Sequence, residues 1–172
     1  MTPFRFRPRT WVALALVGSL SLSLPALAQL RIGQPSGFTG TISAGVKENT
    51  LGAQLYFDAV NARGGVLGQK VELISVDDQF APQRTVELAR QLITEDRVLA
   101  LFLNRGTPHS QALMPLLAEY KIPLIGPSSG AMVLHNPVNP WIFNVRATYQ
   151  REASEAIEHL ARLGITRTAV LS

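Results

Sequence analysis

Residues 102–131, FLNRGTPHSQALMPLLAEYKIPLIGPSSGA, contain two apolar runs that each lead into a turn of glycines and hydroxyl residues, with a segment of helical period between them. In open α/β sheets, ligands bind outside the carboxyl ends of the strands, where loops and helix N-termini present backbone N–H groups. Thr107, Ser128 and Ser129 stand in these turns. They are therefore the first candidates for contacts with a small polar ligand.

Outward from this stretch, short β-rich apolar runs alternate with segments of helical period, which is the pattern of βαβ units. We expect strands at 30–34, 71–76, 98–103, 123–125, 141–145 and 168–171, and helices around 53–60, 83–95, 108–120 and 150–163. Gly64 and Gly65 predict the end of the first helix, and Pro82 the start of the second. The sequence therefore predicts an α/β fold with an open, mostly parallel sheet and helices on both faces.

The first 28 residues have the features of a secretory signal peptide. Three arginines and no acid precede an apolar run over 11–24, and Ala26-Leu27-Ala28 fits a small-x-small cleavage site. The run is shorter than the ~20 residues that a spanning helix needs. An uncleaved anchor is the alternative, which the well-placed cleavage site disfavours. We expect cleavage before Gln29 and export to the periplasm.

Loss of the signal removes three of the 16 basic residues and leaves 13 against 12 acidic ones. A nearly neutral chain without a basic stripe offers no electrostatic footprint for nucleic acid or for an anionic membrane. The chain has no cysteine, so it has neither a disulfide nor a lipid-attachment residue. We therefore expect a freely diffusing exported protein whose stability comes from a packed core.

Residues 29–172 are enough for one domain, and 47% of the whole chain is hydrophobic. The last apolar run, at 168–171, is expected to be a strand without a helix after it. We therefore expect this domain to be the amino-terminal part of a longer protein.

Five stretches carry a family resemblance, and together they cover nearly all of residues 30–172. They are RIGQPSGFTGT, DAVNARGGVLGQKVEL, VDDQFAPQRTVELARQLI, the stretch 102–131 and WIFNVRATYQRE. The chain resembles the amino-terminal lobe of leucine/isoleucine/valine-binding proteins, the periplasmic receptors of ABC transporters with the type I periplasmic binding fold. The resemblance implies a monomeric, two-lobed receptor that closes on a small solute, delivers it to an inner-membrane permease, and needs no cofactor.

The resemblance also assigns ligand contacts. Thr107 falls where the family places a hydroxyl that binds the ligand carboxylate, and Ser128 and Ser129 fall in a second binding turn. Both assignments have a purely structural alternative. Thr107-Pro108 fits a helix N-cap followed by a first-turn proline, and serines beside Pro127 are common turn formers.

Three further residues complete the expected ligand-binding set. Tyr149, in the turn after the fifth strand, could add a phenol or a ring face, or could be half-buried core. Phe38 and Thr39 lie in the glycine-rich turn after the first strand. The chain departs from the branched-chain amino-acid receptors at Gly130, where they tend to carry threonine, and at Ala44, where an aromatic residue is common. These departures leave open an amino acid, an amide or an aromatic acid as ligand.

Enzymatic and metal-binding functions fit less well. Gly126-Pro127-Ser128-Ser129-Gly130 satisfies the G-x-S-x-G pattern of a serine hydrolase that would use Ser128, but no aspartate follows it. The glycines after the first strand do not match the dinucleotide pattern. His109, His135 and His159 are scattered without metal-ligand spacing, and we expect them on the surface.

Asp77 and Asp78 follow the second strand, and we expect them to cap a helix and to have a structural role. A sensor ectodomain with the same lobe is the alternative to a transport receptor, and sequence beyond the second lobe would discriminate between them by a membrane span.

Overall fold

The computed structural model describes residues 29–169, so the predicted signal peptide lies outside the described residues. The elements are β1 (Leu30–Ser36), α1 (Ser43–Ala62), β2 (Val71–Asp77), α2 (Pro82–Thr94), β3 (Ala100–Phe102), α3 (Thr107–Tyr120), β4 (Leu124–Ile125), the 3-10 turn η1 (Met132–Leu134), β5 (Ile142–Phe143) and α4 (Tyr149–Arg162). Five of the expected strands and all four helices are confirmed. Of the expected sixth strand, Thr168 and Ala169 have no regular structure, and the rest lies outside the described residues.

The strands form one sheet in the order β2-β1-β3-β4-β5, and every pair within it is parallel. The predicted parallel α/β sheet is therefore confirmed. All strands point the same way, so the turns that follow them gather at one edge of the sheet. The strand order changes direction between β1 and β3, and this switch point is where open α/β sheets bind ligands.

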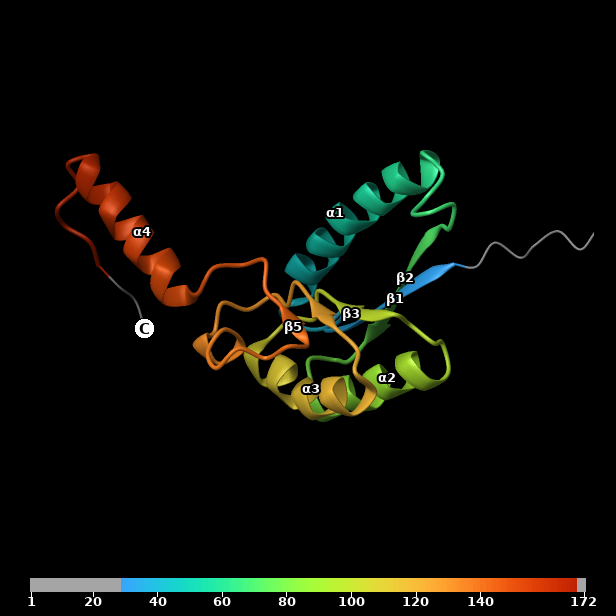
Figure 1. Ribbon diagram of the computed structural model, residues 1–172. Helices are drawn as coiled ribbons and strands as arrows, with labels where there is room; N and C mark the ends of the chain where they lie inside the picture. The colour runs from blue at the N-terminus through green and yellow to red at the C-terminus, as the bar shows by residue number, and fades with distance from the viewer. Residues whose placement is uncertain (1–28, 170–172) are drawn as a thin grey trace, which may run out of the picture.

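The helices cover both faces of the sheet, as predicted. In Figure 1, α1 lies on one face, while α2 and α3 lie together on the other. The packed core is on the side of α2 and α3, and its fully buried side chains include Ala89, Leu92, Leu101, Leu113, Leu117 and Leu124. The helix α4 extends away from the sheet and buries none of its residues (Figure 1).

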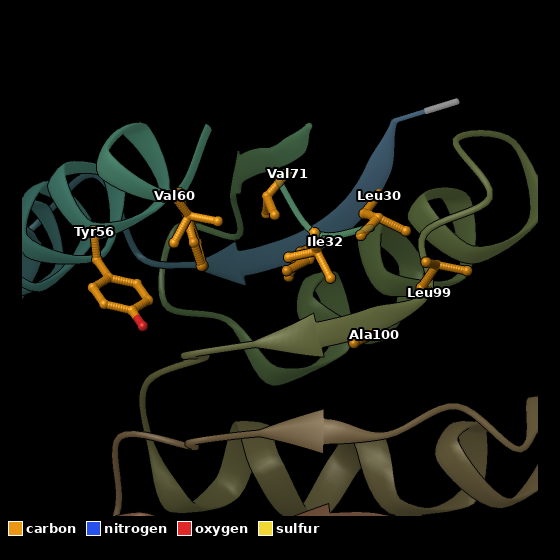
Figure 2. Close-up of a pocket in the computed structure, with 9 residues that line it drawn as sticks. Leu30, Ile32, Tyr56, Val60, Val71, Leu99 and Ala100 are labelled. Atoms are coloured by element: carbon orange, nitrogen blue, oxygen red, sulfur yellow. The ribbon is translucent and has the colours of Figure 1, made fainter. Parts of the chain in front are cut away.

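The face covered by α1 is more open. Only Val46 of α1 is buried, and the side chains of Leu51, Leu55 and Tyr56 are more than half exposed. A cavity of about 350 Å³ lies between α1 and the first residues of the strands, among side chains such as Tyr56, Val60 and Leu99 (Figure 2). Its walls are mainly apolar, with Tyr56 as the one lining residue that carries a polar side-chain group, and it lies at the amino ends of the strands.

Gly52 lies in the middle of α1, where glycine is a poor helix former. A Cβ added to it would meet no atom within 4 Å. We expect Gly52→Ala to raise the free energy of unfolding by about 0.5–1 kcal/mol, because alanine loses less backbone entropy on folding. Urea denaturation measures this. Gly65→Ala is the contrast, since its Cβ would lie 2.0 Å from the Gln69 carbonyl at φ +75°, and it should destabilise. A loss of stability in Gly52→Ala would show that this part of α1 is packed.

Candidate functional site

The turns after β3 and β4 are bonded to each other at the carboxyl edge of the sheet. The Ser128 N–H donates to the Asn104 carbonyl at 2.8 Å. The Asn104 side chain is fully buried and bonded to the Ser110 hydroxyl of α3 at 3.1 Å. The end of β3, the start of α3 and the turn after β4 therefore hold one another in a fixed arrangement.

Three of the predicted ligand-binding residues meet at one hydroxyl. The Ser129 hydroxyl lies 2.7 Å from the Thr107 hydroxyl, and the Tyr149 hydroxyl donates to Ser129 at 3.4 Å. Ser129 is 1% exposed and also accepts from the Ala131 N–H at 3.2 Å. Thr107 stays partly exposed above it. Thr107 lies 22 positions before Ser129 in the sequence, and Tyr149 lies 20 positions after it. The three residues nevertheless form a single cluster, which we call the hydroxyl cluster (Thr107, Ser129 and Tyr149).

The hydroxyl of Thr107 does not cap its helix. Gly106 is the N-cap residue of α3, with φ +107°, and Thr107 is the first helical residue without a side-chain cap hydrogen bond. The N-cap interpretation of Thr107 is therefore wrong. Gly106 takes the N-cap position with its positive φ, so the Thr107 hydroxyl is not used for capping and contacts Ser129 instead. The first bond of the helix runs from the Ser110 N–H to the Gly106 carbonyl, so the earlier N–H groups face the turn.

Tyr149 is held in place from both sides. Its N–H donates to the Gly130 carbonyl at 2.8 Å, and the Arg146 guanidinium lies 5.0 Å from its ring centre. Its hydrogen bond to Ser129 is the main reason that the pKa of Tyr149 lies below its ordinary value, and the charge of Arg146 lowers it further. A Cβ on Gly130 would lie 2.9 Å from the ring and 2.6 Å from the Ala147 carbonyl. Tyr149 therefore occupies the space that a threonine at position 130 would need.

Ser128 lies in the same turn as Ser129 but outside the hydroxyl cluster. Its side chain is partly exposed and forms no side-chain hydrogen bond with any residue in 29–169. No described histidine or acid therefore contacts it as a general base would. Its backbone, rather than its hydroxyl, joins the turns after β3 and β4.

Phe38 and Thr39 lie in the turn after β1 and are bonded to Asp77. The carboxylate of Asp77 accepts from the Phe38 N–H at 2.8 Å and from the Thr39 hydroxyl at 2.7 Å. Asp78 is buried and accepts from the Phe80 N–H and the Thr85 hydroxyl. These bonds agree with the structural role expected of the two aspartates, but the helix-capping role is wrong, because the N-cap of α2 is Ala81 and has no side-chain cap hydrogen bond. Among residues 29–169, the hydrogen bonds that Phe38 and Thr39 form with side chains run to Asp77 and not to the hydroxyl cluster.

The carboxylate of Asp77 makes folding stability depend on pH. Partial burial would raise its pKa, but hydrogen bonds from the Thr39 side chain and from the N–H groups of Gln79, Phe38 and Thr39 hold the pKa below its ordinary value. A carboxyl with a lowered pKa stabilises the fold above its unfolded pKa, and this contribution is lost as pH falls through the folded pKa. We expect Asp77→Asn to flatten the decline in the urea midpoint below about pH 4. An unchanged pH profile in Asp77→Asn would contradict this role.

The three histidines do not behave alike. His109 is 2% exposed and stacks on the Phe80 ring at 4.3 Å between ring centres, so its expected surface position is wrong. It lies in the first turn of α3, under the turn that follows β2. His159 is exposed. Within residues 29–169, no group of three or more metal-ligating side chains is placed to hold an ion.

Sequence reasoning missed Arg105 and Asn104, which lie between β3 and Thr107. A charged residue in the turn after a buried strand, beside the candidate residue Thr107, was the available signal for Arg105.

No described helix has the length and apolar character to cross a membrane.

Comparison with known proteins gives the chain a family. A family model described as "Periplasmic binding protein" matches residues 29–172. An amino acid binding protein of Pseudomonas aeruginosa is 32% identical over 90 residues, which are 52% of this chain and 24% of that protein.

Solved structures agree in fold. A substrate-binding periplasmic protein from Ralstonia solanacearum has a TM-score of 0.73 and 33% identity, covering 81% of this chain and 39% of that one. A solute binding protein of an ABC transporter from Rhodopseudomonas palustris, solved with 3,4-dihydroxy benzoic acid, has a TM-score of 0.67 and 26% identity, covering 80% and 37%. The chain thus spans less than two fifths of the length of these relatives. It belongs to the periplasmic binding protein family and corresponds to the amino-terminal part of the type I periplasmic binding fold.

Proposed function

We propose that this protein is a solute-binding receptor of an ABC importer. It captures an amino acid or another small carboxylate at the carboxyl edge of the sheet and delivers it to a permease in the inner membrane. Residues 1–28 act as a cleaved signal peptide, and residues 29–172 form the amino-terminal ligand-binding lobe of a periplasmic monomer. Binding and release require no cofactor and no chemical step.

The convergence of Thr107 and Tyr149 on Ser129 is the observation that supports this proposal most strongly. A carboxylate that leaves water needs several donors at once, and hydrogen bonds to a charged group are the strong kind. The hydroxyl cluster and the turn of Ser128 supply such donors at one edge. A likeness to an amino acid binding protein and to a receptor solved with an aromatic acid favours a carboxylate, which both ligand classes share.

The mechanism that follows is capture by one lobe and enclosure by a second. This lobe presents fixed hydroxyl and N–H groups, because hydrogen bonds among the turns hold them before the ligand arrives. A second lobe closes over the bound carboxylate by hinge motion and excludes water. Enclosure strengthens the hydrogen bonds that the first lobe makes.

Calorimetry on the full-length protein tests the proposal. The probes are L-leucine, L-phenylalanine and 3,4-dihydroxybenzoate, each paired with the alcohol that replaces its carboxylate. We expect at least one acid to bind and its alcohol to bind at least about 100-fold more weakly, because buried donors would lose their partner. Equal affinity for an acid and its alcohol, or silence toward every acid, would contradict the proposal.

A further inference from the structure

We infer that Arg105 binds the ligand carboxylate directly. This inference rests on the proposed function and adds a residue to its binding site. It goes beyond the hydroxyl cluster, because it adds a fixed positive charge to the site.

The position of Arg105 places its charge at the switch point of the sheet. It follows β3 and precedes Gly106 and Thr107 in the turn that leads to α3. Its guanidinium reaches across to the first turn of α1, where a Cβ built on Gly45 would lie 2.9 Å from Nη1 and 3.7 Å from Nη2. The side chain therefore spans the two turns, after β1 and after β3, between which an open α/β sheet binds its ligand.

Arg105 has no anionic partner in the part of the chain that the structure describes. Five arginines pair with carboxylates, namely Arg31, Arg90, Arg146, Arg151 and Arg162. Three others, Arg63, Arg97 and Arg167, are exposed to solvent, and Arg84 is exposed and donates to a carbonyl. Arg105 alone combines partial burial with the absence of any side-chain hydrogen bond to residues 29–169. Its planar donor fork matches a carboxylate, so an anionic ligand would satisfy it.

Three carboxylates near this edge bond to other groups of the protein. Asp77 accepts from the turn after β1, and Asp78 accepts from Thr85 and Phe80. Glu152 forms two bonds with Arg146, at 2.6 and 2.7 Å. None of the three pairs with Arg105, so its charge is left for an anionic ligand.

The salt dependence of binding tests the charge. The full-length protein is titrated with L-leucine, L-phenylalanine and 3,4-dihydroxybenzoate at several salt concentrations. We expect the affinity of the tightest acid to fall as salt is raised, and to fall less in Arg105→Gln. The same salt dependence in Arg105→Gln as in the unchanged protein would overturn the inference and leave the proposed function standing.

Variants test the residue itself. We expect Arg105→Gln to weaken the tightest acid about 10- to 100-fold, and Arg105→Lys to restore part of the loss because it keeps the charge without the fork. Gly45→Ala displaces the guanidinium without removing it and should also weaken binding, while the exposed Arg63→Gln is the neutral control. Thermal unfolding confirms that each variant is folded. If Arg105→Gln left the affinity unchanged while Thr107→Val lowered it, the role of Arg105 would be refuted and the proposed function would stand.

Discussion

Replacement of Thr107 by valine should weaken binding of the carboxylate ligand about 10- to 100-fold and leave the melting temperature nearly unchanged. The substitution removes one hydroxyl and keeps the shape of the side chain. A hydrogen bond to a charged group contributes about 1.5–3 kcal/mol, which corresponds to this loss. Ser129 keeps its bonds from the Ala131 N–H and from Tyr149, so the turn after β4 should hold its conformation.

Calorimetry on full-length variants measures this prediction, with the tightest acid of the panel as the ligand. Thr94→Val is the matched control, since it removes the hydroxyl of an exposed threonine that bonds only to the Arg90 carbonyl of its own helix. The combination Thr107→Val with Ser129→Ala should cost less than the sum of the two single losses, because the two hydroxyls contact each other. Equal affinity in Thr107→Val and Thr94→Val would show that Thr107 does not bind the ligand, whereas additive losses would show that the two hydroxyls act independently.

Gly130→Thr should lower the free energy of unfolding by about 1–3 kcal/mol and should also weaken ligand binding, although it adds a hydroxyl beside the site. The new Cβ would lie 2.6 Å from the Ala147 carbonyl and 3.0 Å from the Tyr149 N–H nitrogen. Both contacts are with backbone atoms, which cannot move aside as a flexible side chain would. The substitution therefore forces the Gly130 turn away from Tyr149 and disturbs the hydroxyl cluster.

Urea denaturation and calorimetry measure the two effects separately. Gly130→Ala is the matched control, because it introduces the same Cβ without a hydroxyl and should lose a similar amount of stability. A Gly130→Thr variant with unchanged stability and tighter binding would mean that Tyr149 does not occupy this space.

The fold could be predicted because its signals are local. The apolar run at 98–103 indicates a buried strand, and the glycines at 64 and 65 indicate a helix end, whatever the rest of the chain does. The structure places β3 inside that run and ends α1 at Ala62. The alternation of such segments was enough to predict a parallel sheet with helices on both faces.

The site could be predicted only in part, because it depends on which strands are neighbours. Local sequence identified Thr107 and Ser129 as residues of two turns, but their 2.7 Å contact follows from the pairing of β3 with β4. The approach of Arg105 to Gly45 follows from the pairing of β1 with β3, which no local pattern encodes. The burial of His109 against Phe80 likewise depends on how two separate turns pack.

A crystal structure of the full-length protein with its tightest small acid tests the central claim most directly. We expect the ligand carboxylate to lie at the carboxyl edge of the sheet, with its oxygens at about 2.6–3.2 Å from the Thr107 hydroxyl and from donors of the turn that contains Ser128 and Ser129. A carboxylate bound elsewhere, for example beside Tyr56 and Val60 at the opposite end of the strands, would contradict the account.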